Sequence, residues 1–75
     1  MNQIRIKFQS SEDVNSFIQI VNQYPYDMDL SKGRIIIDAK SILGIMTLGF
    51  DNEVILSIHT EECQELVNQL EKFLV

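Results

Sequence analysis

The sequence contains few of the residues that most often carry metal, redox or membrane functions. Its 75 residues include one Cys, one His and no Trp. The lone Cys63 cannot form an internal disulfide, and one Cys with one His excludes a zinc-finger type of metal site. No apolar run reaches the roughly 18–20 residues of a membrane span. We therefore expect a protein of the reducing cytoplasm that has no metal, cofactor or membrane partner.

Positive charge is also scarce. Six Lys and Arg stand against 11 Asp and Glu, which gives a net charge of −5. An acidic protein is repelled by the phosphates of nucleic acids, so direct nucleic-acid binding is not expected. No P-loop, dinucleotide-binding glycine motif or nucleophile–base pair appears in the chain. The sequence therefore predicts one small domain over residues 1–75 that is not an enzyme.

The first half of the chain shows the pattern strand, helix, hairpin. Apolar residues alternate with polar ones over residues 3–9, as in a half-buried strand. Ser10 or Ser11 then caps a helix with an apolar stripe from Val14 to Val21, and Pro25 is expected to end this helix near Tyr24. Residues 27–30 and 34–38 flank Ser31-Lys32-Gly33 and predict a hairpin.

The second half predicts a short helix, a strand and a final helix. Ser41 precedes the apolar residues 42–48, and Gly49 closes that helix. Residues 54–59 alternate as a strand, and Thr60 is expected to cap a helix with an apolar stripe from Cys63 to Leu74. The order is β-α-β-β-α-β-α, which predicts an α+β fold with the helices on one face of a sheet.

The other face of that sheet should be open to water. Two β-branched residues on it, Ile36 and Ile55, reflect strand propensity or mark a weak dimer contact, so we expect a monomer or a weak dimer. The residues expected on the open face are Arg5, Lys7, Asp29, Ile36, Asp38, Ile55, Ser57 and His59.

Residues 39–49, Ala-Lys-Ser-Ile-Leu-Gly-Ile-Met-Thr-Leu-Gly, resemble the regulatory-serine segment of the HPr family of the bacterial sugar phosphotransferase system. In that segment a Lys-Ser pair opens a short helix that ends in Leu-Gly. The element order and the closing residues 70–74 are also similar to the family. The resemblance implies an HPr-like open-faced β-sandwich with antiparallel strand order 1-4-2-3.

The resemblance breaks at the start of the first helix, where HPr proteins carry phosphate on a histidine. Counted back from Phe17, the histidine position falls on Ser10, the arginine position on Glu12 and the proline position on Asp13. A phosphate at a helix N-terminus needs free N–H groups and a nearby cation, whereas two carboxylates repel it. We therefore expect a variant that lacks the phosphocarrier histidine.

By resemblance, Ser41 sits where HPr kinase/phosphorylase modifies HPr, although Ser41 could equally be only a helix cap. Ile42, Leu43 and Met46, with Lys40, match the family's docking patch, and a short helix that is apolar on nearly every side cannot bury all of them. Ile45 and Leu48 are expected in the core.

His59 is the only histidine, and no second catalytic group accompanies it, so we expect an ordinary surface histidine. Cys63 is expected to be a buried small hydrophobe.

The leading hypothesis is a regulatory HPr-like protein of carbon catabolite repression. The resemblance implies three kinds of protein partner, namely HPr kinase/phosphorylase, a LacI-type catabolite regulator and phosphotransferase-system enzymes. Two alternatives stay open: an unphosphorylated interaction scaffold, and a true phosphocarrier that uses another residue.

Overall fold

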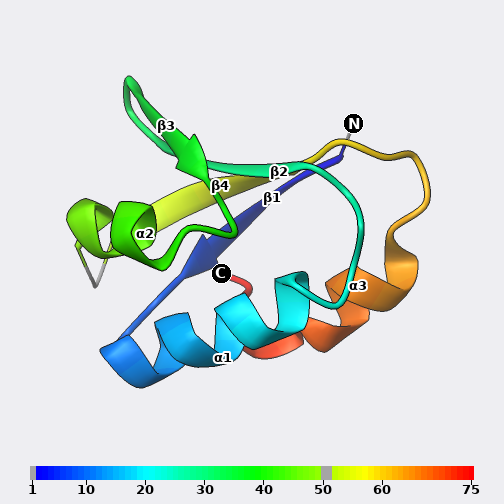
Figure 1. Ribbon diagram of the computed structural model, residues 1–75, viewed down its shortest axis with the longest axis horizontal. Helices are drawn as coiled ribbons and strands as arrows, with labels where there is room; N and C mark the ends of the chain where they lie inside the picture. The colour runs from blue at the N-terminus through cyan, green and yellow to red at the C-terminus, as the bar shows by residue number, and fades with distance from the viewer. Residues whose placement is uncertain (1, 50–51) are drawn as a thin grey trace.

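Four antiparallel strands form one sheet, and the helices lie on one of its faces (Figure 1). The computed structural model describes residues 2–49 and 52–75, and the following statements concern those residues. The sheet order is β1-β4-β2-β3, so the expected α+β fold and its strand order are confirmed. The strands are β1 (Asn2–Lys7), β2 (Met28–Lys32), β3 (Ile35–Asp38) and β4 (Glu53–Ile58), and the helices are α1 (Ser11–Val21), α2 (Ile42–Leu48), α3 (Gln64–Gln69) and the 3₁₀ turn η1 (Glu71–Phe73).

The core fills the space between the sheet and the helices. Side chains on one face of β1, β2 and β4 pack with the apolar stripes of α1 and α3, because the strand period of two and the helix period of 3.6 both place apolar residues on one side. Phe8, Phe17 and Phe73 meet edge to face at its centre, with ring centroids 5.0 to 5.9 Å apart. No buried polar side-chain atom of the described residues lacks a hydrogen-bond partner.

The open face carries the residues expected there. Ile36 is 69% exposed and Ile55 is 39% exposed. The register places Arg5 opposite Ile55, Ile55 opposite Ser31, and Ser31 opposite Ile36, so these four residues form one row across the sheet. Figure 1 shows no helix above this face.

The first helix ends at Val21, the last residue of its apolar stripe, rather than near Tyr24 as Pro25 predicts. α1 stops at Val21, and the N–H groups of Gln23 and Tyr24 bond back to carbonyls three residues earlier as a tight turn. Pro25 favours an extended conformation at the residue before it, which explains why the helix does not continue.

The last helix begins later than expected, and Thr60 does not cap it. The Thr60 hydroxyl accepts a bond of 3.4 Å from the Glu62 N–H in a turn, and α3 starts only at Gln64. The chain uses the intervening residues to pass from the sheet to the helical layer. The prediction that Leu74 belongs to the apolar stripe of the last helix was also wrong. Leu74 is 41% exposed and forms a β-bridge with Ile6.

None of the helices in the described residues is both long enough and apolar enough to cross a bilayer.

Candidate functional site

Ser41 begins α2 and caps it. The Ser41 hydroxyl oxygen accepts a hydrogen bond of 3.2 Å from the Gly44 N–H, and the Ser41 carbonyl accepts one of 3.0 Å from the Ile45 N–H. Ser41 is half-buried, and its own N–H donates to the Asp38 carbonyl at 3.1 Å. The N-cap predicted from the Ser…Gly pattern is therefore present. No acidic residue lies in the first turn of α2.

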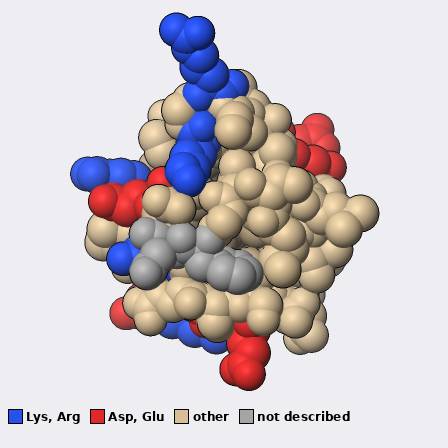
Figure 2. All heavy atoms as spheres, turned by 90° about the vertical axis from the view of Figure 1, so that its left-hand side faces the viewer, with Lys and Arg blue, Asp and Glu red and all other residues tan. Residues whose placement is uncertain are grey.

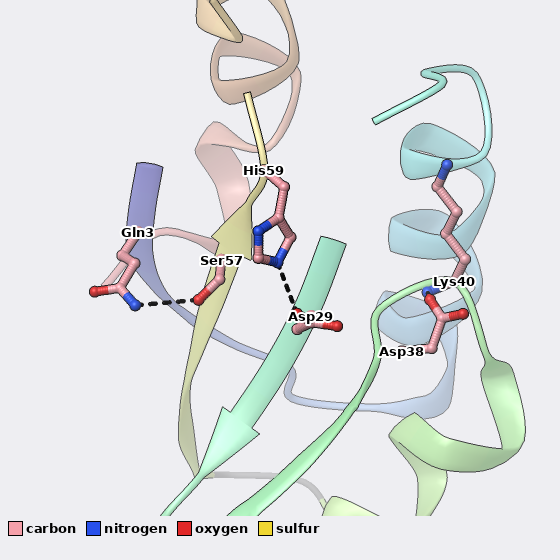
Figure 3. Close-up of polar contacts among 6 residues, drawn as sticks. All are labelled: Gln3, Asp29, Asp38, Lys40, Ser57 and His59. Atoms are coloured by element: carbon pink, nitrogen blue, oxygen red, sulfur yellow. Dashed lines mark hydrogen bonds and ion pairs between the residues drawn. The ribbon is translucent and has the colours of Figure 1, made fainter. Parts of the chain in front are cut away.

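Lys40 turns away from Ser41. Its ammonium donates a bond of 2.7 Å to the Tyr24 carbonyl, in the turn that follows α1. Its backbone N–H donates to the Asp38 carboxylate at 2.9 Å (Figure 3). Cations favour the carboxyl end of a helix, because the last carbonyls there lack intrahelical partners. Lys40 thus ties the start of α2 to the end of α1.

Tyr24 receives this contact and extends it to α3. Its hydroxyl oxygen accepts a bond of 2.7 Å from the Gln69 amide, and its ring stacks on Tyr26 with centroids 5.9 Å apart. Burial, followed by the negative charges of Glu65 and of ionised Tyr26, raises the pKa of the Tyr24 hydroxyl. Tyr24 therefore stays neutral around pH 7.

The apolar residues of α2 separate cleanly into two groups. Ile42 is 44% exposed, Leu43 78% and Met46 44%, whereas Ile45 and Leu48 lie in the core. The predicted exposure is confirmed, and we call Ile42, Leu43 and Met46 the α2 patch. Figure 2 shows a broad area without Lys, Arg, Asp or Glu over the middle and right of this side of the molecule, with charged side chains around its edges.

Gly44 lets α2 lie close to the sheet, a role that the sequence did not indicate. A Cβ atom at Gly44 would stand 3.3 Å from Cδ1 of Ile37 on β3. Such a contact is tighter than ordinary van der Waals packing, so a Cβ there would require the Ile37 side chain to shift by a few tenths of an ångström.

The start of α1 is built from its own acidic residues. The Ser10 hydroxyl oxygen accepts a bond of 3.3 Å from the Asp13 N–H, and the Asp13 carboxylate accepts one of 3.0 Å from the Gln9 N–H. Glu12 lies beside Asp13 in the same turn. Ser10, rather than Ser11, is thus the cap, and negative charge already occupies the positive end of the helix dipole.

Comparison with known proteins identifies the family. The family model described as "PTS HPr component phosphorylation site" matches residues 13–75. The chain belongs to the HPr family.

Solved HPr structures share the whole fold. HPr-C-His from Thermoanaerobacter tengcongensis aligns with a TM-score of 0.80 and 25% identity, over 96% of this chain and 89% of that chain. A phosphocarrier protein HPr from Bacillus anthracis str. Ames gives a TM-score of 0.76 and 21% identity, over 99% and 96% of the two chains. The catabolite repression protein Crh of Bacillus subtilis, described as a domain-swapped, intertwined dimer, gives 0.67 and 26%, over 93% and 87%.

No curated protein matches the chain. The family match makes this a protein related to the phosphotransferase system, whose HPr members are phosphocarriers rather than catalytic enzymes. The match begins at Asp13, so Ser10 and Glu12 lie outside the part of the chain that the HPr model covers.

The single histidine of this HPr-family chain lies far from the start of α1. His59 follows β4, and its Nε2 lies 2.7 Å from the Asp29 carboxylate on β2 (Figure 3). Both side chains are about two-fifths exposed. They border an open hollow of about 500 Å³ that is lined by Asp27, Met28, Asp29, Asp38, Lys40 and His59.

The described residues that line this hollow do not form a metal site. No group of three or more His, Cys, Asp or Glu side chains in residues 2–49 and 52–75 is placed to hold a metal ion. Cys63 is free and buried, as expected from its position among apolar residues. Of the predicted site residues, the structure brings Ser41 and the α2 patch together on one helix, while Ser10 and Glu12 lie on another.

Proposed function

We propose that this chain is a regulatory HPr-family protein that lacks the phosphocarrier histidine, is phosphorylated at Ser41 and docks on partner proteins through the α2 patch. The family match and the likeness to Crh support a role in carbon catabolite repression. The observation that carries the proposal is the exposure of Ile42, Leu43 and Met46 around a serine cap with no acidic residue in the helix's first turn.

The surroundings of Ser41 favour a phosphate more than those of Ser10 do. A phosphate adds roughly −1.5 to −2 charges at neutral pH and is stabilised where free N–H groups and no carboxylates surround it. Glu12 and Asp13 occupy the first turn of α1, whereas the first turn of α2 is uncharged. The Asp38 carboxylate near Ser41 is held by the Lys40 N–H.

The kinase test compares the two serines that cap α1 and α2. The protein is incubated with HPr kinase/phosphorylase and ATP, and its intact mass is measured. We expect one phosphate on the wild type and on Ser10→Ala, and none on Ser41→Ala. Phosphate that persists in Ser41→Ala would contradict the proposal.

A parallel reaction tests the phosphocarrier alternative. With phosphoenolpyruvate and the general phosphotransferase enzyme, we expect no acid-labile phosphate, because the chain has no histidine before His59 and Glu12 repels an incoming phosphate. Acid-labile phosphate in this reaction would reverse the assignment.

A scaffold that is never phosphorylated is the second candidate, and one observation favours it. The Ser41 hydroxyl is already engaged with the Gly44 N–H, and Lys40 bonds to Tyr24 instead of facing Ser41. This candidate keeps the α2 patch but not the kinase. Met46→Asp should abolish capture of a purified catabolite regulator in both cases. Only the regulatory function requires that Ser41 is first phosphorylated by HPr kinase/phosphorylase and ATP. Asn15→Asp, an exposed change on α1, is the matched control.

A further inference from the structure

The two edges of the sheet are finished differently. The outer edge of β1 is partly covered by the end of the chain, where Leu74 bridges Ile6 and the Val75 N–H donates to the Arg5 carbonyl at 3.2 Å. The other edge is β3, which pairs with β2 alone. An edge strand offers backbone groups to any strand that can align with it.

The outward-pointing backbone groups of β3 can be assigned from the ladder. The Ala39 N–H donates to the Met28 carbonyl at 3.0 Å, so Ala39 faces β2. Because backbone groups of successive residues point alternately to the two sides, Ile35 and Ile37 also face β2, while Ile36 and Asp38 face outward. The Asp38 carbonyl already accepts a bond of 3.1 Å from the Ser41 N–H, so the N–H and C=O of Ile36 are the groups available to an added strand.

The side chains of this edge are apolar and exposed. Ile36 is 69% exposed and Ile35 53%. Ile36 ends the open-face row that runs through Ser31 and Ile55. Natural edge strands are protected by shortness, charge, Pro or a bulge, and β3 has its short length and Asp38 but no Lys, Pro or bulge in the sequence Ile-Ile-Ile-Asp. The edge is thus a surface that a partner strand would cover.

Two charged residues flank the apolar part of this edge, Arg34 in the turn before β3 and Asp38 at the end of β3. We propose that two copies of this chain pair their β3 edges antiparallel, with Ile36 on the two-fold axis. In this register Ile36 meets its own copy through two backbone hydrogen bonds, and Arg34 of each chain lies opposite Asp38 of the other. The open-face row then continues without a break from one sheet to the next.

Neighbouring registers are less favourable. Centring the pair on Ile37 would place Ile36 opposite the Asp38 carboxylate, and centring it on Asp38 would place two carboxylates opposite each other. Like charges directly opposite on neighbouring strands are destabilising, while opposite charges and paired β-branched residues are stabilising. Two four-residue strands form a small interface, so the dimer is weak and dissociates below about millimolar concentration.

The decisive experiment uses complementary charge variants in sedimentation velocity over about a hundredfold concentration range up to millimolar. Arg34→Glu puts carboxylates opposite each other in both pairs, and Asp38→Lys puts cations opposite each other. Each variant alone should raise the dimer dissociation constant at least about tenfold, since two pairs change from attraction to repulsion. An equimolar mixture of the two should recover association, because both pairs then join opposite charges.

Controls separate this surface from other ways of pairing. Arg5→Glu makes the same change of net charge as Arg34→Glu but lies on β1, so it should leave the dimer within about twofold of the wild type. Circular dichroism verifies that Asp38→Lys, which loses the bond to the Lys40 N–H, stays folded. Nuclear magnetic resonance shifts of the wild type should move with concentration at residues 34–38.

Three results would overturn the proposal. The first is a protein that stays monomeric at millimolar concentration. The second is a dimer that Arg34→Glu does not weaken, as expected for exchange of a whole strand between copies. The third is a dimer that Met46→Asp abolishes, which would move the contact to the α2 patch.

Discussion

The helices α1 and α2 begin with the same serine cap, but the first turn of α1 is acidic and that of α2 is apolar. In each, a serine hydroxyl accepts a bond from the N–H three residues later, from Asp13 in α1 and from Gly44 in α2. The first turns differ, since α1 has Glu12 and Asp13 at the positions where α2 has Leu43 and Gly44.

This difference shows that a capping serine alone does not make an anion site. The dipole of α1 is compensated by its own carboxylates, and the Asp13 carboxylate also bonds the Gln9 N–H. The first turn of α2 has no such compensation and is surrounded by exposed apolar side chains. Within one HPr fold, the site for added charge and for docking is therefore expected at α2 rather than at α1.

A change from no phosphate transfer to transfer is expected when the start of α1 is rebuilt to accept phosphate. Ser10→His combined with Glu12→Arg supplies a nucleophile and a cation, whereas Ser10→His alone leaves the Glu12 carboxylate beside the nucleophile. The double variant should take phosphate from phosphoenolpyruvate and the general phosphotransferase enzyme at least about tenfold faster than the single one, because a cation stabilises the transferring group. Radiolabel transfer measures both rates. Equal rates would show that the carboxylate does not block the site.

A second test separates the two sides of α2. Ile45→Ala removes a fully buried side chain and should lower the free energy of unfolding by about 2–5 kcal/mol. Ile42→Ala, on the exposed side, should change it by less than about 1 kcal/mol. Urea unfolding gives both values. Partner capture should show the opposite order, with the larger loss in Ile42→Ala. A loss of capture confined to Ile45→Ala would show that the α2 patch does not bind the partner.

The two caps themselves should be of similar strength. Ser10→Ala and Ser41→Ala each remove one hydrogen bond to a helix N–H and should lower the free energy of unfolding by about 1 kcal/mol. Glycine at either position should cost only a few tenths of a kcal/mol, because water can then reach the freed N–H. Thermal unfolding of the four variants checks this. A much larger loss at Ser41 would indicate that its hydroxyl serves packing beyond the cap.

Much of this comparison could be predicted from the sequence. The Ser…Gly limits of α2, its division into a buried and an exposed side, and the acidic start of α1 all follow from periodicity and capping rules. Local patterns of this kind depend on residues a few positions apart. The same rules failed at Thr60, because a threonine before an apolar stripe can equally sit in the turn that leads to a helix.

The parts that could not be predicted depend on contacts between distant residues. Lys40 bonds to a carbonyl 16 positions earlier, Gly44 rests against Ile37, and the end of the chain pairs with β1. None of these leaves a periodic signal in the sequence. They link α2 to the turn after α1 and to β3, and they cover part of the β1 edge, so the structure adds spatial relations between surfaces that the sequence does not predict.

The smallest effect is expected when the charge of the second residue of each helix is changed, and it tests directly whether the two helix starts differ in electrostatics. Glu12 and Leu43 hold the same place after the caps of α1 and α2. Leu43→Glu should raise the free energy of unfolding by about 0.3–1 kcal/mol relative to Leu43→Gln, since the added charge meets the positive end of α2. Glu12→Gln should lower it by a similar amount.

Both differences should shrink as salt is raised, because exposed charges are screened. Urea unfolding at low and high ionic strength measures them. Leu43 is 78% exposed. Leu43→Glu should therefore be slightly more stable than Leu43→Gln and should still lose partner capture. That combination separates docking from folding, because a variant that lost capture by unfolding would be less stable. If Leu43→Glu gained nothing over Leu43→Gln, the two helix starts would not differ in the electrostatic way described, and shape alone would distinguish them.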